Sequence, residues 1–190
     1  MKVFLVDQDP VALAKLAGQL RQGEPEAEIF TFPSQDALSL WLETKGSLPA
    51  EKRIRVQTFG NFEVFCNGTP IHFRRSRTKE LFAYLIDRRG AGSTMGELVS
   101  ILWEGRPDSA GVRSQLRSLI TDLRGAFRSV GESGVIIKQR DLIAVDPNRV
   151  DCDYYHFLAG DRAAVNAFRG EYMSNYSWAE ITVGALQQKK

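Results

Sequence analysis

The sequence predicts an α/β protein made of three consecutive parts, and three observations lead to this prediction. Residues 1–49 alternate short apolar runs with amphipathic helical patterns. Residues 50–150 place alternating strand patterns before three helical patterns and a closing hairpin pattern. Residues 151–190 contain short helical pieces rich in aromatic side chains. The expected architecture is a β-α-β-α segment, a domain with an antiparallel sheet and three helices, and a short helical tail.

The composition is that of an ordinary globular protein, with 43% hydrophobic and 25% charged residues. No apolar run is long enough to span a bilayer, and the first ten residues carry no cleavable signal pattern. We therefore expect a cytoplasmic protein with no membrane partner. Its two cysteines, Cys66 and Cys152, are then expected to be reduced.

The first part, residues 1–49, has a regular alternation of elements. Strands are expected at Lys2–Val6 and Glu28–Phe32, with a helix at residues 11–21 between them. Ser34 is a good N-cap for a second helix, and residues 45–52 have the composition of a linker. This order predicts a parallel sheet with right-handed crossovers.

The opening KVFLVDQDP resembles the start of a two-component response-regulator receiver, and the resemblance covers about the first 43 residues. A receiver has five βα units, and the strand that carries its phosphorylated aspartate has no counterpart here. Asp7 matches the first of the two adjacent acids that help bind Mg²⁺ in receivers, but Gln8 occupies the second position. The resemblance therefore implies a truncated receiver that is not phosphorylated.

The second part begins with strands. Residues 53–59 and 62–66 alternate apolar and polar side chains, and Asn67-Gly68 is a strong hairpin signal. Residues 70–73 are the expected returning strand. Together they predict a small antiparallel sheet.

Two helices are expected to follow the sheet. Ser76 can cap the first, which should run to about Arg89 and stop at Gly90. Thr94 and Glu97 form a capping-box pattern that opens the second. A loop at residues 104–111 leads to the third helix. The residues expected to build the core of this domain are Leu81, Leu85, Leu98, Leu102, Leu116, Ile120 and Leu123.

Residues 112–130 predict a third helix with two distinct faces. Six apolar residues recur at steps of three and four, which is the pattern of one buried face: Val112, Leu116, Leu119, Ile120, Leu123 and Phe127. Arginines and small hydroxyl side chains lie on the open face: Arg113, Arg117, Arg124, Arg128, Ser114, Ser118 and Thr121. Because no acid lies on this stripe, the arginines are expected to be unpaired and able to meet phosphates and base edges. A merely solvated face is the alternative interpretation.

The domain closes with a hairpin pattern at residues 135–139 and 142–146, whose tip is Arg140-Asp141.

Positive charge is concentrated in the second part of the chain. Residues 51–150 carry seventeen bases and eleven acids, a surplus of +6, whereas residues 1–50 carry four bases and seven acids, or −3. A basic surplus confined to one domain favours a nucleic-acid partner, although it could simply aid solubility.

From Arg53 to about Pro147, the chain resembles a winged helix-turn-helix domain of the OmpR/PhoB type. The resemblance rests on the TFGNFEVF start, the second helix closing on ILW, the loop, the arginine helix and the basic hairpin. It implies a DNA-binding domain whose third helix lies in the major groove and whose hairpin, the wing, touches neighbouring DNA.

Carried over residue by residue, the resemblance divides the contacts. The groove contacts are Arg113, Ser114, Arg117, Ser118 and Thr121, phosphates fall to Arg124 and Arg128, and the wing contacts are Lys138, Gln139 and Arg140. Arg74, Arg75 and Arg77 could add phosphate contacts or be merely solvated. In that family the 104–111 loop can contact RNA polymerase, and an ordinary connector is the alternative.

The tail, residues 151–190, resembles the opening of the bacterial transcriptional activation domain of antibiotic-regulatory (SARP) activators. The resemblance rests on Phe157-Leu158, Gly160-Asp161 and the GEYMSNYSWAE run. Helical pieces are expected around residues 154–158 and 162–168, with the aromatic side chains packed as a cap on the winged helix.

The sequence thus predicts a sequence-specific DNA-binding transcription regulator of the response-regulator and SARP kind, with double-stranded DNA as its partner. No cofactor and no enzymatic activity are expected. Cys66, His72, Cys152 and His156 could supply four zinc ligands, but their spacing is not that of a compact zinc site. The main alternative is a protein-interaction module on a degenerate winged helix. An unpaired strand edge in residues 1–49 would also allow a homodimer.

Overall fold

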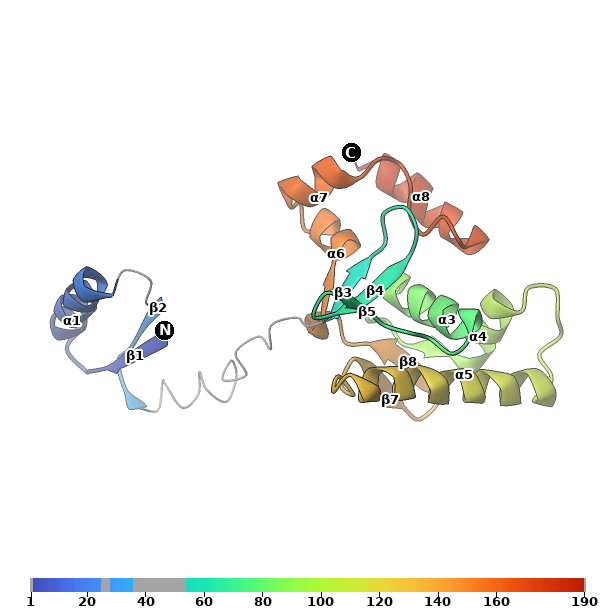
Figure 1. Cartoon of the computed structure of the whole chain (residues 1–190), viewed down its shortest axis with the longest axis horizontal. Coiled ribbons are helices and arrows are strands. Elements are labelled where there is room, and N and C mark those ends of the chain that lie inside the picture. Colours follow the sequence, from blue (N-terminus) through green and yellow to red (C-terminus); the bar gives the residue numbers. More distant parts are fainter. Residues whose placement is uncertain (1, 25–27, 36–53, 190) are drawn as a thin grey trace. The chain divides into compact units, whose positions relative to one another are not determined.

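A computed structural model describes residues 2–24, 28–35 and 54–189 (Figure 1). The chain divides into two compact units, residues 1–50 and 51–190, and each is described by itself. The helix expected after Ser34 and the linker expected at residues 45–52 lie outside the described residues. The mixed α/β character that the sequence predicts is confirmed.

The first unit contains a parallel pair of strands and one helix. Strand β1 (Lys2–Val6) pairs with β2 (Glu28–Phe32) in the parallel sense, as predicted, with Val3 opposite Ile29. Helix α1 (Pro10–Gly23) connects them and begins where the Asp9 carboxylate accepts the N–H of Val11 at 2.8 Å. Its apolar face packs through Leu13 and Ala17, which are buried.

The second unit is built on a four-stranded sheet in the order β5-β4-β3-β9. Its strands are β3 (Ile54–Gln57), β4 (Glu63–Cys66), β5 (Thr69–Pro70) and β9 (Val150–Cys152). Asn67 and Gly68 both have positive φ angles, 49° and 80°, which is the geometry of a two-residue hairpin turn.

Two of the expected strands are shorter than predicted. The returning strand β5 ends at Pro70 instead of continuing to residue 73. Pro70 has no N–H to donate, and after one further bond, from the Ile71 N–H to the Val64 carbonyl at 2.8 Å, the chain leaves the sheet. Strand β3 ends at Gln57 because the next two backbone N–H groups, of Thr58 and Phe59, donate to the carboxylate of Asp153.

Three helices follow: α3 (Ser76–Asp87), α4 (Met95–Leu102) and α5 (Ala110–Ser129). Ser76 does not cap α3, contrary to the prediction, because it is already the first helical residue and Arg75 holds the cap position without a side-chain bond. Helix α3 ends at Asp87, two residues before the predicted end at Arg89. The backbone after it is left-handed at Arg89, with φ 55°, and at the predicted stop Gly90, with φ 88°. Thr94 caps α4 as predicted, accepting the Glu97 N–H at 3.2 Å.

Helix α5 begins two residues earlier than predicted, because the Ser109 hydroxyl accepts the Val112 N–H at 3.3 Å and starts the helix at Ala110. Its predicted apolar face is confirmed, since all six side chains are at most 7% exposed. They pack against α3 and α4 in one hydrophobic core that includes the seven predicted core residues. Trp103 also lies in this core, at 4% exposure.

A second, three-stranded sheet carries the predicted hairpin. Strands β7 (Ile136–Gln139) and β8 (Leu142–Val145) pair around the tip residue Arg140, whose φ is 50°. A short strand that the sequence did not indicate, β6 (Ser93–Thr94), pairs with β8 on its other side, giving the order β6-β8-β7. The second unit therefore has its sheet, three helices and hairpin in the predicted order.

The tail is more than a cap, because it belongs to the second unit's main sheet. After a 3₁₀ turn, η1 (Pro147–Arg149), β9 lies parallel to β3, with Ile54 opposite Val150. The remaining elements are α6 (Asp153–Leu158), α7 (Arg162–Ala167), η2 (Ser177–Ala179) and α8 (Glu180–Gln187). The sequence indicated α6 and α7 but neither β9 nor α8.

Polar bonds join the tail to the earlier strands and helices. The Asp153 carboxylate accepts both the Thr58 N–H, at 2.9 Å, and the Thr58 hydroxyl, at 2.6 Å. The Tyr172 hydroxyl donates to Asp87 at 2.8 Å, and the Tyr155 hydroxyl donates to the Ile86 carbonyl at 2.9 Å. The predicted aromatic packing is also present, since Tyr154, Phe157, Phe168 and Tyr172 are buried.

Among the described helices, none combines the length and apolar character that a membrane crossing requires.

We predict that Asp153→Ala lowers the free energy of unfolding of the second unit by about 2–3 kcal/mol, because it leaves part-buried backbone N–H groups without an acceptor. Asp151→Ala is the matched control. Among the described residues its carboxylate contacts the exposed His156 ring, at 2.5 Å, so its loss should cost less than about 1 kcal/mol. Urea denaturation measures both; equal effects would mean that the Asp153 bonds do not hold the tail.

We also predict that a chain beginning at Glu51 stays folded, because the two units form separate compact bodies and the second has its own core. Its melting temperature should match that of the second unit in the full chain. A loss of cooperative unfolding by circular dichroism would show that residues 1–50 are part of the same folding unit.

Candidate nucleic-acid interface

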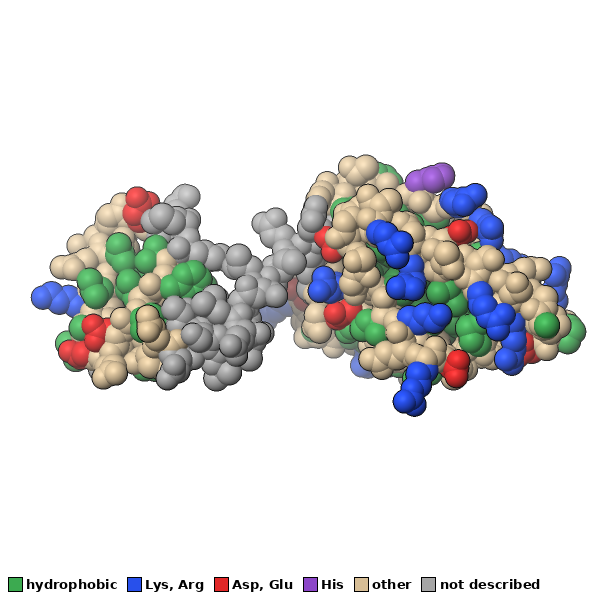
Figure 2. Space-filling model, turned by 90° about the horizontal axis from the view of Figure 1, so that it is seen from below, with side chains coloured by type: hydrophobic (Ala, Val, Ile, Leu, Met, Phe, Trp, Pro, Cys, Tyr) green, Lys and Arg blue, Asp and Glu red, His purple; other side chains and the backbone are tan. Residues whose placement is uncertain are grey.

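The predicted contact residues of α5 all lie on its exposed face. The helix buries its apolar side, so the side chains opposite are directed to solvent: Arg113, Ser114, Arg117, Ser118, Thr121, Arg124 and Arg128. Figure 1 shows α5 along the lower edge of the second unit, and the view from below in Figure 2 shows Lys and Arg side chains gathered on that face. Helix geometry alone thus produces a basic surface backed by a rigid core.

A shallow pocket of about 340 Å³ lies at the middle of this surface. It is lined by Arg75, Ser114, Arg117, Ser118, Thr121 and Asp122. Four of the predicted groove residues are therefore neighbours, and the structure adds Arg75 from the segment before α3. Of the three arginines predicted to add phosphate contacts, Arg74, Arg75 and Arg77, only Arg75 lines this pocket. Arg77 is already inside α3 and lies over the Trp103 ring, 5.2 Å from its centroid.

An ion pair holds Arg75 against α5. Its Nε lies 3.4 Å from Oδ2 of Asp122, a carboxylate only 14% exposed, while the Arg75 side chain is 50% exposed. Arg75 therefore remains half-exposed beside the pocket that it helps to line. No sequence pattern pairs these residues, because they are 47 positions apart and the packing of α3 on α5 brings them together.

The prediction that the arginine stripe is unpaired is wrong for its first member. Arg113 forms a bidentate pair with Asp108, with Nε 2.7 Å from Oδ1 and Nη2 2.6 Å from Oδ2. Each partner stabilises the charge of the other, which lowers the pKa of the Asp108 carboxyl and raises that of the Arg113 guanidinium. The stripe was judged from α5 alone, and the acid comes from the loop that precedes it.

The other three arginines of the stripe differ from Arg113. Within the part of the chain that the structure describes, Arg117, Arg124 and Arg128 have no carboxylate in ion-pair contact. Their guanidinium donors are therefore available to an anion. The two hydroxyls between them are partly used, since Ser118 donates to the Ser114 carbonyl at 3.3 Å and Thr121 to the Arg117 carbonyl at 2.9 Å. Both hydroxyl oxygens can still accept a bond.

The predicted wing residues lie on the hairpin that follows α5. Lys138 and Gln139 are at the end of β7 and Arg140 is at its tip, and all three are exposed. The pocket at the middle of α5 is lined by residues of α5 and by Arg75, and not by these three wing residues.

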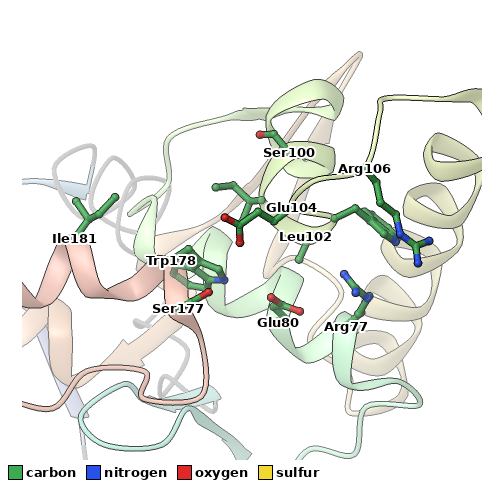
Figure 3. A pocket seen from close by; sticks show the side chains of 11 residues that line it. Arg77, Glu80, Ser100, Leu102, Glu104, Arg106, Ser177, Trp178 and Ile181 are labelled. Carbon is green, nitrogen blue, oxygen red and sulfur yellow. The ribbon is translucent and has the colours of Figure 1, made fainter.

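The structure reveals a second pocket, of about 540 Å³, that the sequence analysis missed. It lies where α3 and the end of α4 meet η2 and α8 of the tail (Figure 3). Figure 3 shows the Trp178 ring beside the Glu80 carboxyl, with Arg77 and Arg106 nearby. Partial burial raises the pKa of Glu80. Residues about 100 positions apart form this pocket, so no local pattern could have indicated it.

The four side chains considered for zinc do not form one site. Cys66 on β4 and Cys152 on β9 are buried on strands that flank β3, and burial raises the pKa of the Cys152 thiol. His156 pairs with Asp151, whereas His72 lines a pocket between the segment before α3 and the tail that contains none of the other three side chains. Across residues 2–24, 28–35 and 54–189, no group of three or more His, Cys, Asp and Glu side chains is placed to hold a metal ion.

Comparison with known proteins gives no matching family model. The transcriptional regulatory protein EmbR of Mycobacterium bovis and of Mycobacterium tuberculosis is 28% identical over 129 residues, which is 64% of this chain and 32% of each relative. The chain thus spans about a third of the length of these relatives. The solved structure of M. tuberculosis EmbR in complex with a low-affinity phosphopeptide superposes with a TM-score of 0.56 at 19% identity, covering 73% of this chain and 42% of that one. This likeness shows a shared fold.

Proposed function

We propose that this protein is a DNA-binding transcription regulator of the SARP-like winged-helix kind, and that α5 enters the major groove of double-stranded DNA. The observation that carries the proposal is the division of α5 into one fully buried apolar face and one exposed face of arginines and hydroxyls. Similarity to the transcriptional regulatory protein EmbR supports it.

Positions along α5 suggest different roles for its residues. Helices that read a major groove contact base edges mainly through their N-terminal half, so Arg113, Ser114, Arg117, Ser118 and Thr121 are the proposed base-reading set. Arg124 and Arg128 lie one and two turns further on, where the groove wall brings phosphates close.

Four further residues extend the proposed interface beyond α5. Lys138, Gln139 and Arg140 would meet the flanking backbone or minor groove from the wing. Arg75 would add a phosphate contact beside the pocket, because half of its side chain remains exposed.

We further propose that the first unit does not act in phosphotransfer. Both of its candidate carboxylates already have structural bonds. Asp7 accepts the Asp9 N–H at 2.9 Å, and Asp9 caps α1 through the Val11 N–H. Gln8 stands at the position of the second metal-binding acid. A Mg²⁺ site needs several oxygen ligands arranged around one ion, and Gln8 removes one of the two adjacent carboxylates that would supply them.

A protein-interaction module is the second candidate function. The observation that favours it is the exposed Ile181, at 85%, on the rim of the 540 Å³ pocket. Interaction surfaces usually place aromatic and apolar side chains at their centre, whereas the proposed interface on α5 has arginines and hydroxyls there. Charge therefore favours DNA as the partner of α5, whatever the second pocket binds.

We predict that the protein binds duplex DNA with an affinity that falls roughly a hundredfold between 50 and 200 mM salt, as expected for about four phosphate contacts.

We predict that Arg117→Ala weakens the free energy of binding to the specific site by about 1–3 kcal/mol and relaxes base preference at one position. Arg128→Ala, its matched control, should weaken specific and random DNA alike. Fluorescence anisotropy on both DNAs checks this, and identical profiles for the two variants would refute the division of roles.

We also predict a contact between RNA polymerase and the first half of the 104–111 loop. The second half is needed elsewhere, because Asp108 holds Arg113 and Ser109 caps α5. Replacing residues 104–107 with Gly and Ser should therefore preserve DNA binding and reduce activation in a reconstituted transcription assay. Extending the replacement to residue 109 should weaken DNA binding as well. Unchanged activation by the shorter replacement would make the loop an ordinary connector.

A further inference from the structure

We infer that Asp108 is a positioning residue that holds Arg113 in the orientation needed to recognise a guanine. The inference rests on the proposed function of α5 and identifies one feature of its DNA target. Asp108 lies in the loop before α5, so the helical period of the sequence does not indicate its role. The geometry of the Asp108–Arg113 pair carries the argument.

A guanidinium has five N–H donors in one plane, and they form distinct edges. Asp108 occupies the edge made by Nε and Nη2, at 2.7 and 2.6 Å. The edge made by Nη1 and the second hydrogen of Nη2 is left with two parallel donors. Guanine presents two acceptors, O6 and N7, on its major-groove edge, and a bidentate arginine is the commonest specific contact to them. The pair thus leaves a donor set that matches guanine.

The carboxylate itself is held in place by the start of the helix. Ser109 follows Asp108 directly, and its hydroxyl accepts the Val112 N–H at 3.3 Å. The Ser109 carbonyl accepts the N–H of Arg113 at 2.9 Å. Asp108 is therefore tied to the first turn of α5, next to the backbone from which the Arg113 side chain projects.

The ion pair between Asp108 and Arg113 contributes little to the stability of the fold. The side chains of Arg113 and Asp108 are 48% and 34% exposed, and ion pairs in water add little to stability. Its main effect is on the freedom of Arg113, since a side chain that is already ordered loses less entropy on binding. A fixed plane also penalises a base whose acceptors do not match the two donors.

Arg117 provides the internal contrast. It lies one turn further along the same exposed face and has no carboxylate in ion-pair contact among the described residues. Its guanidinium can turn toward a phosphate or toward more than one base. We therefore expect the sharpest base preference of α5 at the position that faces Arg113.

The experiment selects bound sequences from random duplex DNA with the full chain and three variants. Arg113→Lys removes the planar donor set but keeps the charge. Asp108→Asn removes the carboxylate charge but keeps the side-chain shape. Asp141→Asn at the wing tip is the matched control, because it removes the same charge from an exposed position that does not touch Arg113. Circular dichroism melting confirms that each variant is folded.

The wild-type chain should select a guanine at one position, and Arg113→Lys should abolish that preference. Asp108→Asn should reduce the ratio of guanine over the other bases about tenfold, whereas Asp141→Asn should keep it. If Asp108→Asn left this ratio unchanged, or only tightened binding on all sequences as Asp141→Asn can, Asp108 would not position Arg113 and the inference would be overturned. If the wild-type chain selected no sequence at all, the proposed function would fail instead.

Discussion

The structure of the second unit depends on the burial of one face of α5. Six apolar side chains of a 20-residue helix are placed in a core shared with α3, α4, both sheets and the tail. Burial at this scale fixes the rotation of the helix about its axis, because turning it by even one residue position would expose leucines and bury arginines. The direction of every exposed side chain on α5 follows from this constraint. The proposed contact with phosphates and base edges depends on this fixed direction.

Short polar side chains then determine where α5 begins and how two of the arginines are oriented. The Ser109 hydroxyl caps α5, Asp108 pairs with Arg113, and Asp122 pairs with Arg75. These carboxylates lower the positive charge of the surface locally, and in return they order two long side chains. Among the described residues, Arg117, Arg124 and Arg128 have no carboxylate partner. The proposed interface thus combines arginines paired with a carboxylate and arginines without one, which fits the separate needs of base recognition and phosphate attraction.

Polar bonds and strand pairing also join the tail to the main sheet of the second unit. Residues 150–152 add a parallel strand to the sheet, and Asp153 ends the neighbouring strand by taking its next two N–H groups. The tail thereby supports the sheet on which the helices pack, and it also forms one wall of the pocket between Trp103 and Trp178.

By itself, the sequence determined the elements whose causes are local. Periodicity specified both faces of α5, Asn67-Gly68 specified the hairpin, Thr94 specified the start of α4, and the predicted core leucines and isoleucine are buried as expected. What the tertiary structure decided are the contacts between residues distant in the chain, and the exact limits of elements that those contacts set. Strand β9, the early end of β3, the Arg75–Asp122 pair and the second pocket all join segments more than 40 residues apart. The Asp108–Arg113 pair spans only five positions, yet it too was decided by the folded chain, because the path of the loop before the helix is not encoded in the helical period. A period describes one element, whereas the pairing of charges depends on how two elements meet.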